Sequence, residues 1–235
     1  KNVRLCVENY AKADKRIVYK KLEKNTGISG NTNACIEMAT GDYISLFDHD
    51  DVLHPSALFA TMQAICYEGA DFVYTDEAVF AGSNIRKIIT FQLKPDYSVD
   101  NLRAHNFICH FSSFSRELLE KAGWFRSEFD GSQDHDIILR LTSHAKKVYH
   151  IQKVLYFWRS HPGSVAGDIG SKLYAIQAGR NAVASNVIAS GYNCTVDSSK
   201  PCPTIYRIHY ELLSNPLVSI VIADDKKDTE IKKCI

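Results

Sequence analysis

The feature that most constrains the fold is an alternation of short apolar runs with amphipathic segments. The runs at 16–20, 43–47 and 71–75 (RIVYK, YISLF and DFVYT) are typical of strands, and the segments at 31–41 and 55–69 are typical of helices. Strands that alternate with helices predict an α/β fold around a mostly parallel sheet. In such sheets ligands bind beyond the carboxyl ends of the strands, so polar residues that follow a strand are candidate site residues.

The rest of the chain continues this pattern. The helix that begins at Pro55 carries an apolar stripe expected to face the core, made up of Leu58, Phe59, Met62, Ile65 and Cys66. Ser115 and Ser132 are the expected N-caps of two later helices. Further helices are predicted at 115–123, 132–144 and 171–191, further strands at 3–7, 147–151 and 154–158, and a loop or hairpin at 193–203.

Composition narrows the class of protein. The 235 residues carry a net charge of +1 and no block of Lys and Arg interleaved with aromatics, so a nucleic-acid partner is not expected. No apolar run reaches the roughly 18 residues of a membrane-spanning helix, and the N-terminus lacks the apolar region of a signal peptide. The seven cysteines form no CxxC pair and are expected to be reduced, buried thiols of a cytoplasmic protein, with a Cys194–Cys202 bridge as the less favoured alternative.

Three carboxylates follow the strand predicted at 43–47, namely Asp48, Asp50 and Asp51. Asp48 and Asp50 flank His49, so in an extended segment their side chains point the same way. Carboxylates are hard ligands that suit Mg²⁺ or Mn²⁺, and Mg²⁺ typically takes one or two of them and completes its shell with waters and substrate phosphates. The alternative is an Asp-rich turn in which Asp51 caps the next helix.

Asp134 is the second candidate site residue. It falls in the first turn of the helix predicted at 132–144, where a carboxylate could take a proton from an incoming hydroxyl. Acids are also favoured in a first helical turn by the helix macrodipole, which would lower the pKa of Asp134 and weaken it as a base. The residues alone leave catalysis and capping equally open.

Arg159 and His161 are the third candidate pair, and they follow the apolar strand predicted at 154–158. Because they alternate along the chain, both can face one side. A cation near a metal–phosphate site stabilises a departing phosphate, and His161 is a candidate metal ligand. A solvated loop is the alternative interpretation.

Together, these motifs resemble those of the inverting, GT-A fold glycosyltransferases of family 2. The resemblance is greatest to bacterial polysaccharide-building members that often carry tandem transferase domains, and it covers residues 16–165 densely. It rests on five ordered segments, NTGISGNTNACIEMATGDYISLFDHDDVLHP, DFVYTDEA, LKPDYSVDNL, NFICHFSSFSRELLEKAGWFRSEFDGSQDHDIILRL and VLYFWRSHPGSVA. It implies a Rossmann-like three-layer fold with a mostly parallel central sheet.

The resemblance implies a metal site and a catalytic base. Asp48 and Asp50 would be the D-x-D acids, with Asp50 as the most direct metal ligand. His161 would approach the metal or the diphosphate, with Arg159 beside it as a catalytic cation. Asp134 would be the general base.

The resemblance also implies the two sides of the substrate cleft. Gln133 stands where the family commonly has Glu, beside the base. The donor side would be formed by Gly27, Asn33, Asp48, Asp76 and Glu77. The acceptor side would be formed by Trp124, Phe125 and Gln133.

The chain departs from the family pattern at its N-terminus. The family's first strand and the Asp-rich loop after its second strand, which holds the nucleotide base, have no match here, so the donor pocket is expected to be incomplete. Residues 1–200 are expected to form the GT-A domain, and 201–235 a linker with the first strand and helix of a following or completing unit. The run 217–222 resembles the missing strand, and the hypothesis is that it replaces this strand in its own molecule or in a neighbour's, as a strand-exchanged oligomer.

The implied function is metal-dependent transfer of a sugar from a nucleoside-diphosphate donor to a carbohydrate hydroxyl, with inversion, in bacterial surface polysaccharide synthesis. Mg²⁺ or Mn²⁺ is the expected cofactor, and a lipid-linked glycan acceptor would place the protein at the inner membrane face. Two other classes stay open. One is a non-catalytic or incomplete sugar-nucleotide-binding domain, and the other is a metal-dependent phosphohydrolase or nucleotidyltransferase; a phosphohydrolase would release phosphate without a sugar acceptor.

Overall fold

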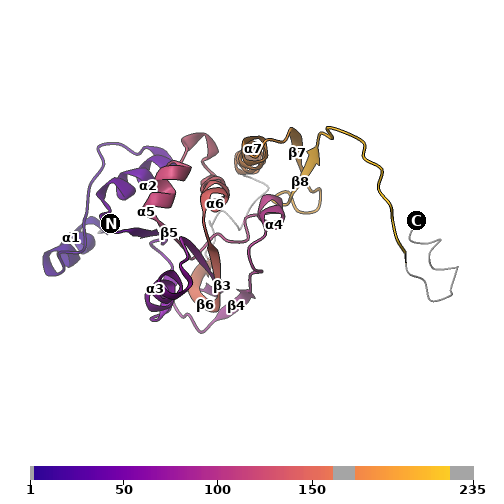
Figure 1. The fold of residues 1–235 in the computed structure, drawn as a ribbon. Helices are drawn as coiled ribbons and strands as arrows, with labels where there is room; N and C mark the ends of the chain where they lie inside the picture. The colour runs from indigo at the N-terminus through magenta and orange to yellow at the C-terminus, as the bar shows by residue number, and fades with distance from the viewer. Residues whose placement is uncertain (1–2, 161–172, 223–235) are drawn as a thin grey trace.

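The computed structural model describes residues 3–160 and 173–222, and the statements below concern these residues (Figure 1). The helices are α1 (Val3–Ala13), α2 (Gly27–Met38), α3 (Ala57–Glu68), α4 (Val99–Ala104), α5 (Arg116–Ala122), the 3₁₀ turn η1 (Ser127–Phe129), α6 (Gln133–His144) and α7 (Leu173–Ala189). The strands are β1 (Tyr43–Ser45), β2 (Val52–Leu53), β3 (Phe72–Ala81), β4 (Ile88–Gln92), β5 (Ser112–Ser115), β6 (Val148–Ser160), β7 (Cys194–Ser198) and β8 (Tyr206–Tyr210).

A mixed six-stranded sheet forms the centre of the molecule, in the order β1–β5–β3–β6–β2, with β4 paired to β3 off this path. The ladder between β3 and β6 is parallel and involves every residue of β3. Strand β5 is antiparallel to both β1 and β3, so β1, β3 and β6 all run in one direction. The predicted α/β class is confirmed, with an antiparallel strand inserted between two strands of common direction.

Helices cover both faces of the sheet, which confirms the three-layer arrangement (Figure 1). Helix α3 packs on one face, where its alanines contact Val73, Ile151 and Leu155. Helices α2, α5 and α6 pack on the other face around a larger core that includes Phe72 and Phe114, whose rings stack 6.3 Å apart. The carboxyl end of β1 leads into the loop that carries Asp48, Asp50 and Asp51, whereas Asp76 and Glu77 lie within β3, which continues to Ala81.

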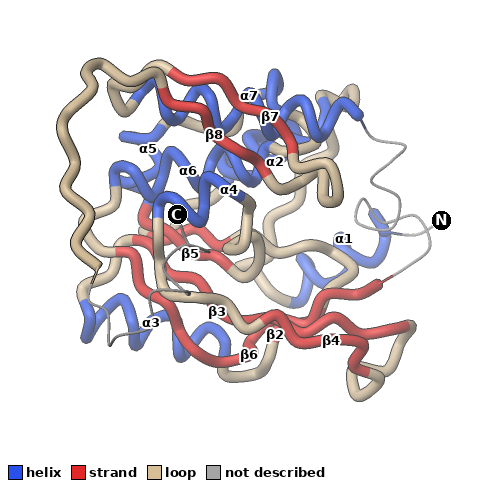
Figure 2. Tube along the Cα trace, turned by 90° about the vertical axis from the view of Figure 1, so that its right-hand side faces the viewer, coloured by secondary structure: helices blue, strands red, loops and turns tan. Residues whose placement is uncertain are grey.

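Helix α7 and the hairpin of β7 and β8 lie against the outer side of α6 (Figures 1 and 2). Tyr206 of β8 is only 7% exposed, and its hydroxyl lies directly over Gly179 of α7. A Cβ atom at position 179 would overlap that hydroxyl. The hairpin thus docks on α7 at a point where the helix has no side chain.

Most predicted elements are present. The predicted segments at 43–47, 71–75, 115–123 and 193–203 match β1, β3, α5 and the β7–β8 hairpin, and the two strands predicted at 147–158 are one long strand, β6. Ser115 caps α5 as predicted, because its side chain accepts a hydrogen bond from the N–H of Leu118. Ser132 precedes α6 but makes no such bond; its hydroxyl donates to the carbonyl oxygen of Ala175 instead.

Two predicted strands near the N-terminus are wrong. Residues 3–7 belong to α1, where Val3, Val7 and Tyr10 follow a helical spacing and Arg4 forms an i,i+4 ion pair with Glu8 at 2.6 Å. Residues 16–20 form no strand, because no described segment pairs with them and Val18 is 61% exposed.

The predicted buried stripe of α3 is wrong except at Ile65, which is buried. Leu58, Phe59 and Met62 are 61%, 73% and 47% exposed, and the buried face is built from Ala57, Ala60, Thr61, Ala64 and Ile65. Small side chains let the helix approach the sheet closely, and they exclude larger ones from that face. The cysteines depart from expectation in a similar way: the six described ones are free, as predicted, but Cys6, Cys35, Cys66 and Cys202 are exposed.

The segment 217–222 lies outside the sheet. It follows the hairpin as an extended segment without a described strand partner, and Leu217 and Val221 are 98% and 91% exposed. The hypothesis that it replaces a missing strand in its own molecule is therefore wrong. None of the described helices is long and apolar enough to cross a membrane.

Candidate active site

The acidic loop after β1 is exposed to solvent at one end and buried at the other. Asp48 has a side chain that is 58% exposed, whereas Asp51 is only 8% exposed. The Asp51 carboxylate accepts hydrogen bonds from the hydroxyl of Tyr156 and, at 2.7 Å, from the backbone N–H of Arg159. Asp51 therefore ties the loop to β6. It does not cap α3, which begins after Ser56.

Arg159 binds the backbone of the same loop. Its Nε donates to the carbonyl oxygen of Asp50 at 2.5 Å, and its Nη1 donates to the carbonyl oxygen of Gly82. Its guanidinium also stacks over the ring of Phe80, 4.6 Å from the centroid. These contacts join Arg159 to the acidic loop, and its expected role as a catalytic cation stays a prediction.

His110 is a site residue that the sequence patterns did not single out. Its side chain is 14% exposed, its Nε2 lies 3.6 Å from Oδ2 of Asp48, and its ring stacks on Tyr156 at a centroid distance of 5.1 Å. Burial by itself lowers the pKa of His110, but the sulfur of Cys109 and the carboxylates of Asp134 and Asp48 outweigh burial and raise it. The sequence feature that could have indicated His110 as a site residue is its place as the only histidine in the segment NFICHFSSF.

Asp134 begins the first turn of α6, close enough to Asp48 and His110 for their charges to change its pKa. Desolvation raises the pKa of Asp134, opposed by His110, while the charge of Asp48 adds to the rise. Gln133 donates from Nε2 to Oδ2 of Asp134 at 3.0 Å and accepts from the N–H of Gly131 at 2.8 Å. The net shift of the Asp134 pKa is therefore upward, so a lowering by the helix macrodipole, the alternative that the sequence left open, does not dominate.

Asp76 and Glu77 are buried and bind protein groups. Oδ1 of Asp76 accepts from the backbone N–H of Lys94 at 2.8 Å and from Nε2 of His150 at 2.9 Å. Oε2 of Glu77 accepts from the ammonium of Lys94 at 3.1 Å. Asp76 and Glu77 are only 5% and 2% exposed, and their expected place in the lining of the donor–acceptor cleft stays a prediction.

Asn33, a donor-side candidate, contacts Phe125, an acceptor-side candidate. The Asn33 side chain donates to the carbonyl oxygen of Phe125 at 2.8 Å and accepts from the N–H of Phe125 at 3.1 Å. The ring of Phe125 is buried in the core, whereas Trp124 is 37% exposed, and their expected place beside an acceptor sugar stays a prediction. Gly27 starts α2 with a φ of +83°, and a Cβ there would lie 2.6 Å from Oδ2 of Asp130.

The comparison with protein families identifies the family to which this chain belongs. Residues 2–123 match the family model described as "Glycosyl transferase family 2". This chain belongs to glycosyl transferase family 2.

Relatives and solved structures agree with this placement. The chain is 37% identical to "Uncharacterized protein y4gI" of Sinorhizobium fredii, over 92% of this chain and 24% of the relative. It is 32% identical to "O-antigen biosynthesis protein RfbC" of Myxococcus xanthus, over 81% of this chain and 15% of the relative. The chain thus spans a quarter or less of these relatives. The structure of S. aureus TarS 1-349 in complex with UDP-GlcNAc matches at a TM-score of 0.63 and 16% identity, over 80% of this chain and 54% of TarS 1-349, and confirms the GT-A fold.

The acids of this family 2 chain fit a divalent cation. Asp48 and Asp50 offer two hard oxygen ligands on one loop, which is the number of carboxylates that Mg²⁺ commonly takes while substrate phosphates and waters complete its shell. Among the described residues no group of three or more His, Cys, Asp or Glu side chains gathers as a metal cluster. His161, the third predicted ligand, lies outside the described residues.

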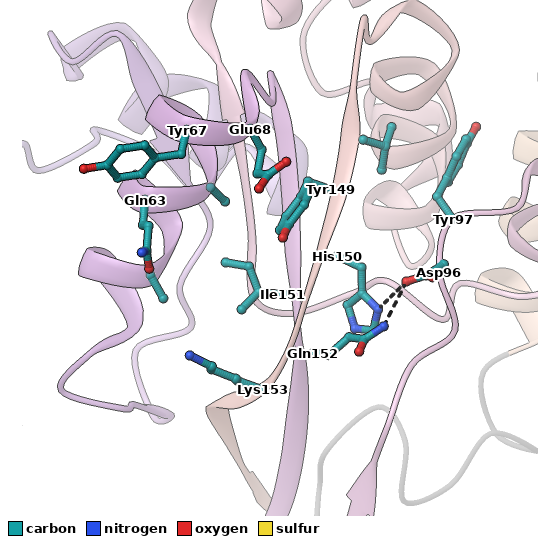
Figure 3. A pocket seen from close by; sticks show the side chains of 13 residues that line it. Gln63, Tyr67, Glu68, Asp96, Tyr97, Tyr149, His150, Ile151, Gln152 and Lys153 are labelled. Atoms are coloured by element: carbon teal, nitrogen blue, oxygen red, sulfur yellow. Dashed lines mark hydrogen bonds and ion pairs between the residues drawn. The ribbon is translucent and has the colours of Figure 1, made fainter.

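A separate cavity of about 660 Å³ lies at the edge of β6 in the family 2 fold. Tyr149, Ile151 and Lys153 point toward α3 there, and His150 and Gln152 point toward Asp96 (Figure 3). None of the predicted site residues lines this cavity. His150 links its wall to the interior, because its two ring nitrogens contact Asp96 at 3.1 Å and Asp76 at 2.9 Å.

Proposed function

We propose that this chain is the catalytic domain of an inverting glycosyltransferase that moves a sugar from a nucleoside-diphosphate donor to a carbohydrate hydroxyl in surface polysaccharide synthesis. The observation that carries the proposal is the convergence of Asp48, His110 and Asp134 at one edge of the sheet, from three separate segments. A basic carboxylate beside an exposed acidic loop suits base-assisted attack on a bound diphosphate sugar.

The donor side is assigned to the acidic loop. Asp48 and Asp50 would hold Mg²⁺ or Mn²⁺, which when bound neutralises charge on the diphosphate. Arg159 and Asp51 keep the loop backbone in place through the bonds to β6 described above. The TarS complex with UDP-GlcNAc supports a nucleotide sugar as the class of donor.

The chemical step is assigned to Asp134. Its carboxylate takes the proton of the acceptor hydroxyl as that oxygen forms a bond to the anomeric carbon from the face opposite the leaving group. The bond from the anomeric carbon to the diphosphate oxygen breaks, and the nucleoside diphosphate leaves with the electron pair. The raised pKa of Asp134 makes it the better base for this transfer.

The polysaccharide context and the larger protein are part of the proposal. The name of the Myxococcus xanthus relative supports O-antigen-like products, and a lipid-linked glycan acceptor would bring the protein to the inner membrane face. The transferase domain is proposed to extend past the expected boundary at residue 200, because β8 pairs with β7 and Tyr206 packs into the main core, and the residues after Tyr210 are proposed to be a linker with the start of a further unit. The length of the relatives, of which this chain covers 24% and 15%, supports such an arrangement.

The first prediction tests the base. Asp134→Asn is expected to reduce sugar transfer by about 10²–10⁴-fold, the contribution typical of general-base catalysis, while the dissociation constant for the donor stays within about threefold. Thermal-shift screening of UDP-, dTDP- and GDP-sugars with and without Mn²⁺ identifies the donor, and isothermal titration then measures its affinity. Asp100→Asn, an exposed acid in the first turn of α4, is the matched control.

Each alternative has its own outcome in this experiment. Normal turnover of Asp134→Asn would show that the base is assigned wrongly. Release of phosphate without any glycan acceptor would favour a phosphohydrolase. Binding of a nucleotide sugar with no transfer to any acceptor would favour a non-catalytic binding domain.

A further inference from the structure

Lys94 is a buried cation that the proposed mechanism does not use. Its side chain is 3% exposed, and its ammonium donates to Oε2 of Glu77 at 3.1 Å, to the carbonyl oxygen of Ile108 at 2.6 Å and to the carbonyl oxygen of His110. A lysine ammonium has three N–H donors, so each of them has a partner. Lys94 therefore joins β3 to the segment that carries His110.

The backbone of Lys94 is fixed as firmly as its side chain. Its N–H donates to Asp76, and the hydroxyl of Tyr74 donates to the carbonyl oxygen of the next residue, Pro95, at 2.6 Å. Asp76 is held in turn by His150 at 2.9 Å. Because these bonds fix the backbone of Lys94 to β3, the ammonium is directed at residues 108–110.

The segment that Lys94 binds needs such support. Cys109 has a φ of +34°, the only positive φ of a non-glycine residue in the described chain. Backbone of this kind is strained and persists where its surroundings over-determine it. The N–H of Cys109 is bound by the Asn106 side chain at 3.2 Å, and Lys94 binds the carbonyl groups on both sides of Cys109.

Stability alone is a poor reason for this arrangement. Burial of a lysine and a glutamate carries a desolvation cost that their attraction often does not exceed, and apolar pairs of similar volume are frequently as stable. What an apolar pair cannot supply is a donor to the two carbonyl groups beside Cys109.

We propose that Lys94, held by Asp76 and Glu77, is a positioning residue that fixes the main chain of Ile108–His110 and thereby holds the His110 ring between Asp48 and Asp134. This role rests on the proposed transferase function for its catalytic consequence. Its structural consequence, the ordering of His110, is independent of that function.

The decisive variant is Lys94→Met/Glu77→Leu, which removes both buried charges at similar volume. Its melting temperature is expected to fall less than that of Lys94→Met alone, in which Glu77 is also left without its cation. In the double variant the ring signals of His110, identified in histidine-labelled NMR spectra by their loss in His110→Gln, are expected to shift and broaden. The signals of the surface residue His209 stay unchanged.

The catalytic readout uses the donor found by the thermal-shift screen. The double variant is expected to lose about 10–100-fold in kcat, as small misplacement in an active site does, while its dissociation constant for UDP with Mn²⁺ changes less than about threefold. The matched control, Lys147→Met/Glu68→Leu, removes an exposed pair 3.0 Å apart and is expected to change neither readout.

Two results would overturn the positioning role. One is a folded double variant with native His110 signals. The other needs no variant: fast hydrogen exchange of the 108–110 amides in the folded native chain, where the clamp predicts slow exchange. If the native chain binds no nucleotide sugar, the transferase proposal fails, and the NMR and exchange results still decide the role of Lys94.

Discussion

Asp134 shows how a residue's surroundings can reverse an expectation based on its helix position. In the first turn of α6 the macrodipole favours the carboxylate, but desolvation and the nearby charge of Asp48 favour the protonated acid, and they dominate. Its sequence position could be predicted from the motif. The sign of its pKa shift could not, because that sign depends on Asp48, which is 86 residues earlier in the chain.

His135, the next residue, is a buried neutral histidine. It is 3% exposed, its Nε2 donates to the carbonyl oxygen of Leu102 at 2.6 Å, and its ring stacks on Tyr206 at 5.8 Å. Desolvation lowers the pKa of His135 from 6.5 to about 4. The folded chain therefore binds this proton less readily than the unfolded chain does.

The second prediction is a loss of stability in acid that depends on His135. Its contribution is fully present above pH 6.5 and is lost as the pH falls toward about 4, because only the unfolded chain then takes up the proton. At about 1.4 kcal/mol per pKa unit, the loss is about 3 kcal/mol. His135→Gln should be less stable at pH 7 but should show a flatter pH dependence in urea unfolding.

His209→Gln is the control for this measurement, since the His209 side chain is 47% exposed and its substitution should leave the pH dependence unchanged. If His135→Gln lost as much stability in acid as the native chain, groups other than His135 would cause that loss.

At the scale of elements, the acidic loop depends on β6. The Asp51 carboxylate accepts hydrogen bonds from the Tyr156 hydroxyl and from the backbone N–H of Arg159. The Arg159 side chain in turn donates to the carbonyl oxygen of Asp50 in the loop. The strand and the loop were both predictable from local pattern. Their connection was not, because it joins residues more than 100 positions apart.

The third prediction concerns this connection. Asp51→Asn is expected to lower the free energy of unfolding by about 1–3 kcal/mol, because an amide offers one acceptor oxygen where two donors are aimed at a buried carboxylate. Asp48→Asn, at a side chain that is 58% exposed, is expected to change it by no more than about 0.5 kcal/mol. Chemical denaturation of both variants measures the difference, and equal losses would contradict the assignment of Asp51 as the link.

Helix α3 shows why a correct element can be given the wrong face. Its largest apolar side chains suggested the buried stripe, yet Ala60 and Ala64 face the sheet while Phe59 is 73% exposed. The period of a helix can be read from its sequence, but the distance at which it packs is set by the partner surface. Helix α1 also has a helical spacing, but none of its residues is buried. An expected buried face could therefore not indicate this helix.

At the scale of the whole molecule, the extended segment 217–222 stands apart from the core. Val218 and Ile220 are 73% and 81% exposed on a run rich in β-branched residues. Exposed apolar strands without partners promote association between chains. The sequence pattern predicted a buried strand here, and this is wrong, because strand pairing depends on a sheet edge that the local pattern does not describe.

The fourth prediction is that Val218→Ser/Ile220→Lys lowers concentration-dependent light scattering and leaves the free energy of unfolding within about 0.5 kcal/mol of the native value. Ser219→Lys adds the same charge without removing apolar surface and separates the two effects. A clear loss of stability in the double variant would show that the segment packs against the fold in solution.

The contact between Tyr206 and Gly179 restricts how related sequences can diverge. While a tyrosine occupies position 206, any side chain at 179 overlaps its hydroxyl, so α7 accepts no other residue at that point with the hairpin docked. A smaller residue at 206 would lift the restriction. A smaller side chain at position 206 is therefore expected to accompany any larger residue at position 179, and the two positions should covary in an alignment although they are 27 positions apart.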